Sequence, residues 1–332
     1  MEVCGTHTAA VFKNGIRSFL SQKIKLVSGP GCPVCVTVVP FIDECIDISL
    51  RPGHELICFG DLMKVPGSEK TLSDAKGSGG RVRMTWSPFD TIELALAEPE
   101  TTFVFAAIGF ETTAPAYALM LEEIEQKQIR NIKLLTSIKS TLTAIDWICA
   151  AGESVDAFLC PGHVSVITGA DAYIPLAEKY RKPFIIAGFE GGHLLSAIRT
   201  AVEAAADVCG DVQNLYPEAV SAKGNARAKA MMEQYFDVCN EVWRGLGVIA
   251  ASGYKPKEKY SLYNFPTRDP NSREGLTEDD PPGGCRCGDV ILGRIDPDEC
   301  PLFGTQCTPV RTIGPCMVSS EGTCGTWYRA RI

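Results

Sequence analysis

The chain has 332 residues, of which 45% are hydrophobic and 22% charged, and its formal net charge is −8. This composition is ordinary for a soluble globular protein, and the length predicts two or three domains. An acidic chain without a basic stripe is not expected to bind nucleic acid. There is no apolar run of membrane-spanning length and no signal-peptide pattern, so we expect a cytoplasmic protein without a membrane partner.

Fifteen cysteines are a large number for such a chain. Without a secretion signal, structural disulfides are not expected, and metal binding or redox chemistry is favoured. Some of these cysteines stand in apolar surroundings, where a thiol serves as a small core residue. The expected core cysteines are Cys45, Cys58, Cys149, Cys209 and Cys239.

The first candidate site is formed by Cys4 and His7, three residues apart just after the expected end of a strand. One helical turn would bring the thiolate and the imidazole to the same side, as a pair suited to a transition metal. The same pair could also act as nucleophile and base. A buried cysteine beside a capping Thr-His pair is the structural alternative.

The second candidate site is the dithiol Cys32-x-x-Cys35. It follows an apolar run at 24–27, which predicts a buried strand, and a Gly-Pro-Gly turn at 29–31. A C-x-x-C after a strand in a βα setting is typical of redox proteins. The two sulfurs could also share a metal, or the cysteines could simply be buried neighbours.

The next elements predict an α/β domain. We expect a helix at 36–50, strands at 55–59 and 81–86, and a helix that starts at Ser87-Pro88. Between the strands, the glycine-rich segment 60–80 is long for a loop and is predicted to be a functional flap. It matches no nucleotide-binding glycine motif.

A second βα series is predicted from residue 99 onward, with strands at 101–108, 132–138, 157–160 and 184–187. Glu111 and His163 follow two of these strands, at the carboxyl ends where parallel sheets collect ligand groups. The structural alternatives are a helix-start carboxylate for Glu111 and a turn histidine for His163. Glu190 and His193 are weaker candidates. The two series predict two similar parallel-sheet α/β domains that face one cleft.

Residues 214–247 are predicted to be helical after Pro217, and they are followed by a predicted linker at 255–284 and a small cysteine-rich domain. Such a short segment with few large apolar residues needs stabilisation beyond core burial, and thiolate ligands favour zinc or an iron–sulfur cluster. Paired C-x-x-C knuckles are absent, so the uneven spacing favours a four-iron cluster over zinc or disulfides. The predicted domains are 1–98, 99–210 and 211–332. The six cysteines of this segment are Cys285, Cys287, Cys300, Cys307, Cys316 and Cys324.

Several short motifs together give the chain a resemblance to the hydrogenase maturation factor HypD family over nearly its whole length. None of these motifs is specific alone. They are 4–8 (CGTHT), 29–35 (GPGCPVC), 109–115 (GFETTAP), 161–165 (PGHVS), 243–247 (WRGLG), 300–304 (CPLFG) and 316–322 (CMVSSEG).

The resemblance implies a scaffold on which iron receives two cyanides and one carbon monoxide before delivery to nickel–iron hydrogenase. It implies that the protein works with the chaperone HypC and receives cyanide from HypE, which acts with HypF. Cys4 would hold the iron, assisted by His7, and Cys32 and Cys35 would be a redox dithiol. The sulfur atoms of these three cysteines would converge on one face of the protein, above a 4Fe-4S cluster in the C-terminal domain. We expect its ligands to be Cys285, Cys300, Cys307 and Cys324, with Cys287 and Cys316 as alternates.

Two departures from the family pattern are visible. Family members usually begin earlier, so Met1 is expected to lie inside the first strand. Residues 188–193 read GFEGGH instead of the usual GFEPLD, which leaves the residues after Glu190 without an expected role.

An enzyme remains the chief alternative to the scaffold, namely an iron–sulfur-dependent thiol–disulfide reductase that acts on a protein partner. A dithiol and a cluster would serve both functions, whereas the Cys4 and His7 pair favours the scaffold. A zinc-stabilised interaction protein is the third possibility. A radical mechanism is not expected, because the chain has no C-x-x-x-C-x-x-C triplet.

Overall fold

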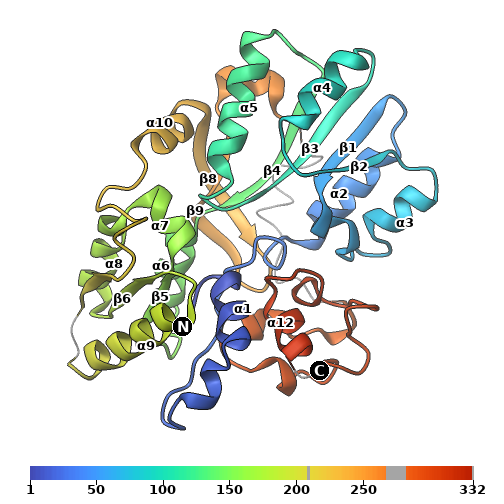
Figure 1. Ribbon diagram of the computed structural model, residues 1–332. Coiled ribbons are helices and arrows are strands. Elements are labelled where there is room, and N and C mark those ends of the chain that lie inside the picture. Colours follow the sequence, from blue (N-terminus) through green and yellow to red (C-terminus); the bar gives the residue numbers. More distant parts are fainter. Residues whose placement is uncertain (208–209, 267–281, 331–332) are drawn as a thin grey trace.

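The computed structural model describes residues 1–207, 210–266 and 282–330. Its secondary structure is mixed α/β, with a larger sheet in the order β2-β1-β3-β4-β9-β8 and a smaller parallel sheet in the order β5-β6-β7. In Figure 1 the larger sheet lies at the top, the smaller one at the lower left, and the cysteine-rich C-terminal segment at the lower right. The strands are β1 (His54–Phe59), β2 (Val82–Thr85), β3 (Thr102–Gly109), β4 (Ile132–Lys139), β5 (Phe158–Pro161), β6 (Phe184–Ala187), β7 (Val212–Asn214), β8 (Phe236–Trp243) and β9 (Gly247–Pro256).

The larger sheet has a parallel core, because β2, β1, β3 and β4 all pair in parallel. Strand β3 is buried along nearly all of its length, as expected for a central strand covered on both faces. Tyr117 of α5 anchors one covering helix by donating its hydroxyl to the Ile108 carbonyl at 2.8 Å. The α-helices are α1 (Gly5–Lys13), α2 (Val39–Ser49), α3 (Leu72–Gly77), α4 (Asp90–Ala97), α5 (Ala114–Gln126), α6 (Thr141–Ala150), α7 (Gly162–Thr168), α8 (Ile174–Tyr180), α9 (Gly191–Ala206), α10 (Ala226–Tyr235), α11 (Cys287–Ile291) and α12 (Thr323–Ala330).

The sheets divide the chain differently from the predicted boundary at 98/99. Strand β1 pairs with β3 across that boundary, with Leu56 opposite Val104, so both βα series contribute to one sheet. The smaller sheet begins only at β5. Repeated βα units look alike in sequence whether they extend one sheet or start another, so the pattern could not place this division.

The predicted helix beyond Pro217 is correct for α10 and wrong for residues 236–247. These residues form β8 and the turn into β9, an antiparallel hairpin that joins the larger sheet where Ile138 pairs with Tyr254. In β8, apolar Phe236, Val238 and Val242 alternate with other residues, which is a period of two rather than of a helix.

Two further predictions differ from the structure. Residues 24–27 form no strand; instead Glu2 bridges to Ser28 and also to Leu159 of the smaller sheet. The flap predicted at 60–80 contains α3, which Thr71 and Asp74 start with a reciprocal capping box. Because Leu72 of this helix is fully buried, the segment is packed onto the domain.

The C-terminal segment packs against the first helix of the chain. The Phe12 ring of α1 meets the Trp327 ring of α12 edge-on at 5.3 Å, and the Arg17 guanidinium lies 4.8 Å from the centre of the Trp327 ring. In Figure 1, α1 and α12 accordingly lie side by side below the larger sheet. Of the helices that the structure describes, none is both long and apolar enough to cross a membrane.

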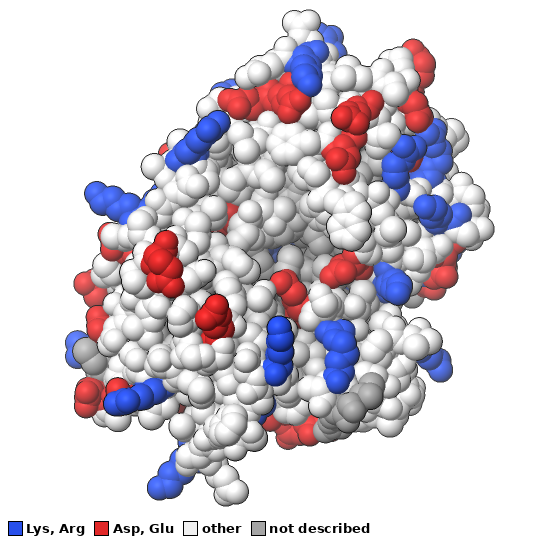
Figure 2. All heavy atoms as spheres, viewed as in Figure 1, with Lys and Arg blue, Asp and Glu red and all other residues white. Residues whose placement is uncertain are grey.

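The face shown in Figure 2 carries interspersed acidic and basic side chains and a central hollow with mainly uncharged walls. Three of the expected core cysteines, Cys45, Cys58 and Cys149, are buried, whereas Cys239 is only half-buried. Cys209 and half of the predicted linker, residues 267–281, lie outside the described residues.

Candidate functional site

The dithiol predicted at positions 32 and 35 is a disulfide in this structure, with the two Cα atoms 5.3 Å apart. The loop closes as a tight turn, because the Cys35 amide donates to the Cys32 carbonyl at 3.1 Å. Thr37 extends the turn by donating its hydroxyl to the Pro33 carbonyl at 2.9 Å. Both sulfur-bearing residues are buried, so their oxidation state depends on access from neighbouring groups rather than from bulk solvent.

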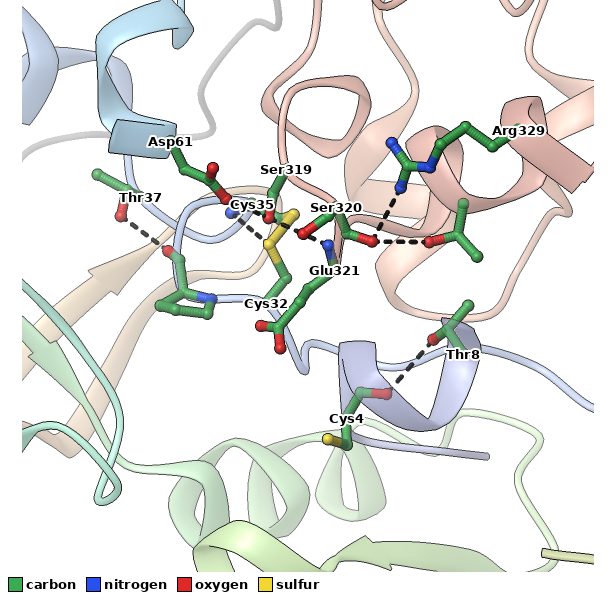
Figure 3. Close-up of a disulfide and its surroundings, with 12 residues drawn as sticks. Cys4, Thr8, Cys32, Cys35, Thr37, Asp61, Ser319, Ser320, Glu321 and Arg329 are labelled. Atoms are coloured by element: carbon green, nitrogen blue, oxygen red, sulfur yellow. Dashed lines mark hydrogen bonds between the residues drawn. A yellow bond between two sulfur atoms is a disulfide. The ribbon is translucent and has the colours of Figure 1, made fainter. Parts of the chain in front are cut away.

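Cys4 lies next to this loop through its backbone. It is the N-cap residue of α1, and the following Gly5 amide donates to the Gly31 carbonyl at 3.2 Å. A Cβ atom on Gly31 would lie only 2.4 Å from the Cys4 nitrogen, so this approach requires glycine. In Figure 3 the Cys4 thiol nevertheless points away from the disulfide, and the Glu321 side chain lies between them. The expected convergence therefore holds for the segments but not for the direction of the Cys4 sulfur.

Burial raises the pKa of the Cys4 thiol to about 11, and the nearby Glu321 carboxylate adds to this rise. Backbone N–H groups of His7 and Thr6 act in the opposite direction, because the first turn of α1 directs them at the sulfur. Cys4 is therefore a protonated thiol at neutral pH in this conformation. It becomes a metal ligand or nucleophile only when its surroundings change or a cation replaces the proton.

The loop at 319–321 ties the C-terminal segment to both other parts of the site. Thr6 donates its hydroxyl to the Glu321 carboxylate at 2.9 Å. Ser319 donates to the Asp61 carboxylate at 2.7 Å (Figure 3). Sequence reasoning assigned no role to Asp61 or Glu321. The only available signal was that Glu321 falls within the family-like stretch 316–322.

A small pocket lies where these segments meet. It combines the disulfide with the start of α1 and with Cys316 from the cysteine-rich segment. Its lining residues are Gly5, Thr8, Gly29, Gly31, Cys32, Cys35, Ile291, Cys316, Glu321 and Thr323.

A second pocket, which we call the cysteine pocket, is lined by all six cysteines of the C-terminal segment. Cys316 lines both pockets and so connects the cysteine pocket to the disulfide. Within the described residues, no three or more His, Cys, Asp or Glu side chains are arranged closely enough to hold a metal ion. The remaining walls of the pocket are Val290, Leu302, Phe303, Gly314 and Met317.

Four thiols of the cysteine pocket interact as two pairs. Cys285 hydrogen-bonds with Cys287, and Cys324 with Cys316; these contacts, together with burial, raise the pKa values of Cys285 and Cys324. A Cβ atom on Gly314 would lie 2.5 Å from the Cys285 sulfur, so glycine leaves room for that thiol. The pocket is therefore a set of soft donors in apolar surroundings.

His7 is fully buried on the side of α1 that faces the smaller sheet. Its Nε2 atom lies 3.2 Å from the Ala187 carbonyl, and burial lowers its pKa to about 4. The Phe189 ring packs 4.9 Å from His7 and stacks at 4.1 Å on His163, which is exposed at the start of α7. Thus His7 and His163 lie together at the carboxyl ends of β5 and β6.

Glu111 is buried just after β3 and caps a helix. Its carboxylate accepts from the Ser140 hydroxyl and the Thr141 amide, both at 2.9 Å, at the N-terminus of α6. Burial raises its pKa. This position suits the structural alternative of a helix-start carboxylate. Glu190 is exposed at the start of α9, and His193 is half-buried on the same helix.

These features define a cysteine-rich α/β protein in which a C-x-x-C disulfide lies next to a second group of thiols. The HypD family model, described as "Hydrogenase formation hypA family", matches residues 1–331. The chain therefore belongs to the HypD family of hydrogenase maturation factors.

Individual members of the family are similar over nearly the whole chain. The hydrogenase maturation factor HypD of Escherichia coli strain K12 is 38% identical over 339 residues, which span 100% of this chain and 88% of that protein. HypD of Azotobacter vinelandii is 37% identical, with 99% of this chain and 88% of that protein covered. The hydrogenase maturation factor HypD2 of Bradyrhizobium diazoefficiens is 40% identical, with the same coverage.

Proposed function

We propose that this protein is the scaffold and redox factor on which the Fe(CN)2CO group of nickel–iron hydrogenase is assembled. In this proposal it works with HypC and receives cyanide from HypE, which acts with HypF. The observation that carries the proposal is the position of Cys316, which lines both the disulfide pocket and the cysteine pocket. Electrons stored among the thiols of one pocket therefore have a short route to the disulfide of the other.

Cys4 is the residue that we assign to the iron cargo. Cyanide- and carbonyl-bearing low-spin iron favours soft thiolate ligands, and Cys4 is the thiol that the Gly31 turn holds beside the disulfide loop. Because its pKa is raised to about 11, iron binding must displace a proton from Cys4. Glu321, bonded to Thr6 beside this thiol, is placed to take part in that proton's departure.

The donor set of the cysteine pocket supports a 4Fe-4S cluster, although the thiols that the structure describes are not arranged closely enough to hold a metal in this conformation. Six soft donors line one pocket with apolar walls, and Gly314 leaves space at Cys285. We assign the cluster to Cys285, Cys300, Cys307 and Cys324, with Cys287 and Cys316 as alternates. When bound, such a cluster supplies single electrons, and two of them with two protons reduce one disulfide to two thiols. Burial of Cys32 and Cys35 restricts competing thiol exchange with solvent.

The test of the scaffold is anaerobic co-purification of the full chain with HypC, followed by infrared spectroscopy. Iron-bound cyanide and carbonyl stretches are expected for the wild type and should be lost in Cys4→Ala. The matched control is Cys149→Ala, which removes an equally buried thiol from α6, far from the disulfide in sequence. If Cys4→Ala retains the stretches and still matures hydrogenase, the scaffold assignment is wrong.

The cluster assignment is tested by iron and acid-labile sulfide analysis of protein purified without oxygen. We expect about four of each per wild-type chain, and a large loss of both in Cys307→Ala, because a missing ligand opens the cluster. Zinc in a colourless preparation would contradict the assignment and favour the zinc-stabilised interaction protein.

A thiol–disulfide reductase is the second candidate function, favoured by the disulfide between Cys32 and Cys35. A reductase needs no separate thiol site. The reductase is favoured over the scaffold if two results hold. Turnover of a protein disulfide must depend on Cys32 but not on Cys4, and a strain with Cys4→Ala must still mature its hydrogenase.

A further inference from the structure

Arg244 is a fully buried guanidinium without a partner. Only 1% of the residue is exposed, and none of its Nε, Nη1 and Nη2 atoms has a hydrogen-bond partner among the described residues. Burying an unpaired charge in a protein interior costs several kcal/mol, so such a side chain is retained only where an anion meets it.

A neighbouring buried cation shows what a complete set of partners looks like in this fold. The Lys139 ammonium donates to the Glu241 carboxylate at 3.1 Å, to the Ser137 hydroxyl at 2.9 Å and to the Val242 carbonyl at 2.8 Å. The chain thus supplies an anion for Lys139. For Arg244, two residues beyond Val242, the described residues supply none.

Arg244 lies at the junction of the disulfide loop and the cysteine pocket. Its amide donates to the carbonyl of Val36, the residue after Cys35, at 3.0 Å. The next residue, Gly245, packs so closely on Gly288 that a Cβ atom there would lie 2.4 Å from the Gly288 Cα. Gly288 directly follows the pocket residue Cys287.

The charge of Arg244 acts on the cysteine pocket itself. The Arg244 guanidinium and the Cys285 side chain are close enough to interact electrostatically. The cation therefore lies close enough to favour negative charge on the pocket sulfurs.

We propose that Arg244 is the buried counter-charge for an anionic thiolate–metal group in the cysteine pocket and raises the reduction potential of that group. The inference rests on the cluster assigned above. A nearby positive charge stabilises the reduced state, which is the more negative one, over the oxidised state. Arg244 is thus a positioning and tuning residue rather than a ligand.

The test compares Arg244→Met, which keeps most of the volume and removes the charge, with Arg286→Gln as the matched control. Arg286 stands between Cys285 and Cys287 in sequence, but it is exposed and paired with Asp289 at 2.9 Å. In potentiometric titration of the full chain with dithionite as electron donor, Arg244→Met should shift the reduced-to-oxidised ratio at fixed potential about tenfold toward the oxidised form. Arg286→Gln should match the wild type, and Arg244→Lys should lie closer to the wild type than Arg244→Met.

Thermal unfolding of the metal-free full chain supplies the second measurement. If Arg244 awaits an anion, Arg244→Met removes an uncompensated charge and should leave the midpoint of the metal-free form unchanged or higher. Failure of this variant to fold without metal, or an unchanged potential in a cluster-loaded variant, would overturn the inference. A wild-type chain that holds neither iron nor sulfide would instead overturn the cluster assignment itself.

Discussion

At the scale of single residues, His7 joins α1 to the smaller sheet as a neutral imidazole. It is fully buried between the Ala187 carbonyl and the Phe189 ring, and its pKa of about 4 means that protonation is excluded until the pH is low. The unfolded chain, in contrast, protonates this histidine near pH 6.5. His7 therefore makes the folded state sensitive to acid.

The sign of this effect gives a prediction. Between pH 6.5 and about 4 the unfolded state binds a proton that the folded state refuses, so the stabilisation is present above pH 6.5 and is lost as the pH falls. Urea unfolding of the wild type should lose about 3 kcal/mol more than His7→Gln between pH 7 and pH 4. His54→Gln, at the start of β1 in the other sheet, is the control. Parallel pH profiles for wild type and His7→Gln would contradict the prediction.

At the scale of elements, the start of α1 is held in place by glycines on both sides. Gly31 lies against the Cys4 backbone, and a Cβ atom on Gly5 would lie 2.3 Å from the Glu321 carbonyl oxygen. Backbone atoms cannot move aside as a flexible side chain can. The disulfide loop, α1 and the C-terminal loop therefore have one relative arrangement, which fixes Cys4 between them.

We predict that Gly31→Ala separates the disulfide loop from α1. The added methyl group would overlap the Cys4 backbone, and such overpacking costs about 1–3 kcal/mol. Gly77→Ala adds the same group at the end of α3, where nothing lies within 4 Å. Thermal unfolding should show a lower midpoint for Gly31→Ala only. Equal midpoints for the two variants would mean that the close approach at Gly31 carries no strain.

The elements that the sequence predicted best are those with an unambiguous pattern. The strand predicted at 101–108 matches β3 to within one residue at each end, because its continuous apolar run at 103–108 is typical of a strand buried on both faces. The hairpin of β8 and β9 was missed, since its first strand follows α10 directly, with no turn residue between them. The motifs predicted that Cys4, Cys32 and Cys35 lie near one another, and the structure places the segments that carry them side by side.

The parts of the site that could not be predicted depend on contacts between distant residues. Apart from its place in the family-like stretch 316–322, no local pattern indicates that Glu321 bonds to Thr6. Arg244 looks like an ordinary arginine until its burial without a partner is seen. The direction of the Cys4 thiol likewise follows from packing around α1, which its spacing to His7 does not encode (Figure 3).

At the scale of the whole molecule, α1 and α12 join the two ends of the chain. Their contact relies on the Trp327 ring, which meets Phe12 edge-on and lies under the Arg17 guanidinium. Beyond this contact, the hydrogen bond from Thr6 of α1 to Glu321 holds the same interface together, and Ser319 ties the C-terminal segment to Asp61 after β1.

Trp327→Ala should therefore loosen both ends of the chain. We expect faster amide hydrogen exchange in α1 and α12, because the aromatic and cation–π contacts that hold them together are lost, and unchanged exchange in the larger sheet. Trp86→Ala is the matched control, because that tryptophan is 99% exposed. If α1 of Trp327→Ala kept its slow exchange, the hydrogen bond between Thr6 and Glu321 would be sufficient to hold α1 in place.

The bond between Thr6 and Glu321 spans 315 positions of the chain. A ribosome adds about 5–20 residues per second, so Cys32 and Cys35 are made some tens of seconds before the loop that covers them. During that interval the two thiols have no C-terminal cover and are accessible to oxidants and thiol exchangers. Translation itself thus makes closure of the loop at 319–321 over the disulfide a late event, and a chain cut short before residue 319 would leave its dithiol without this cover.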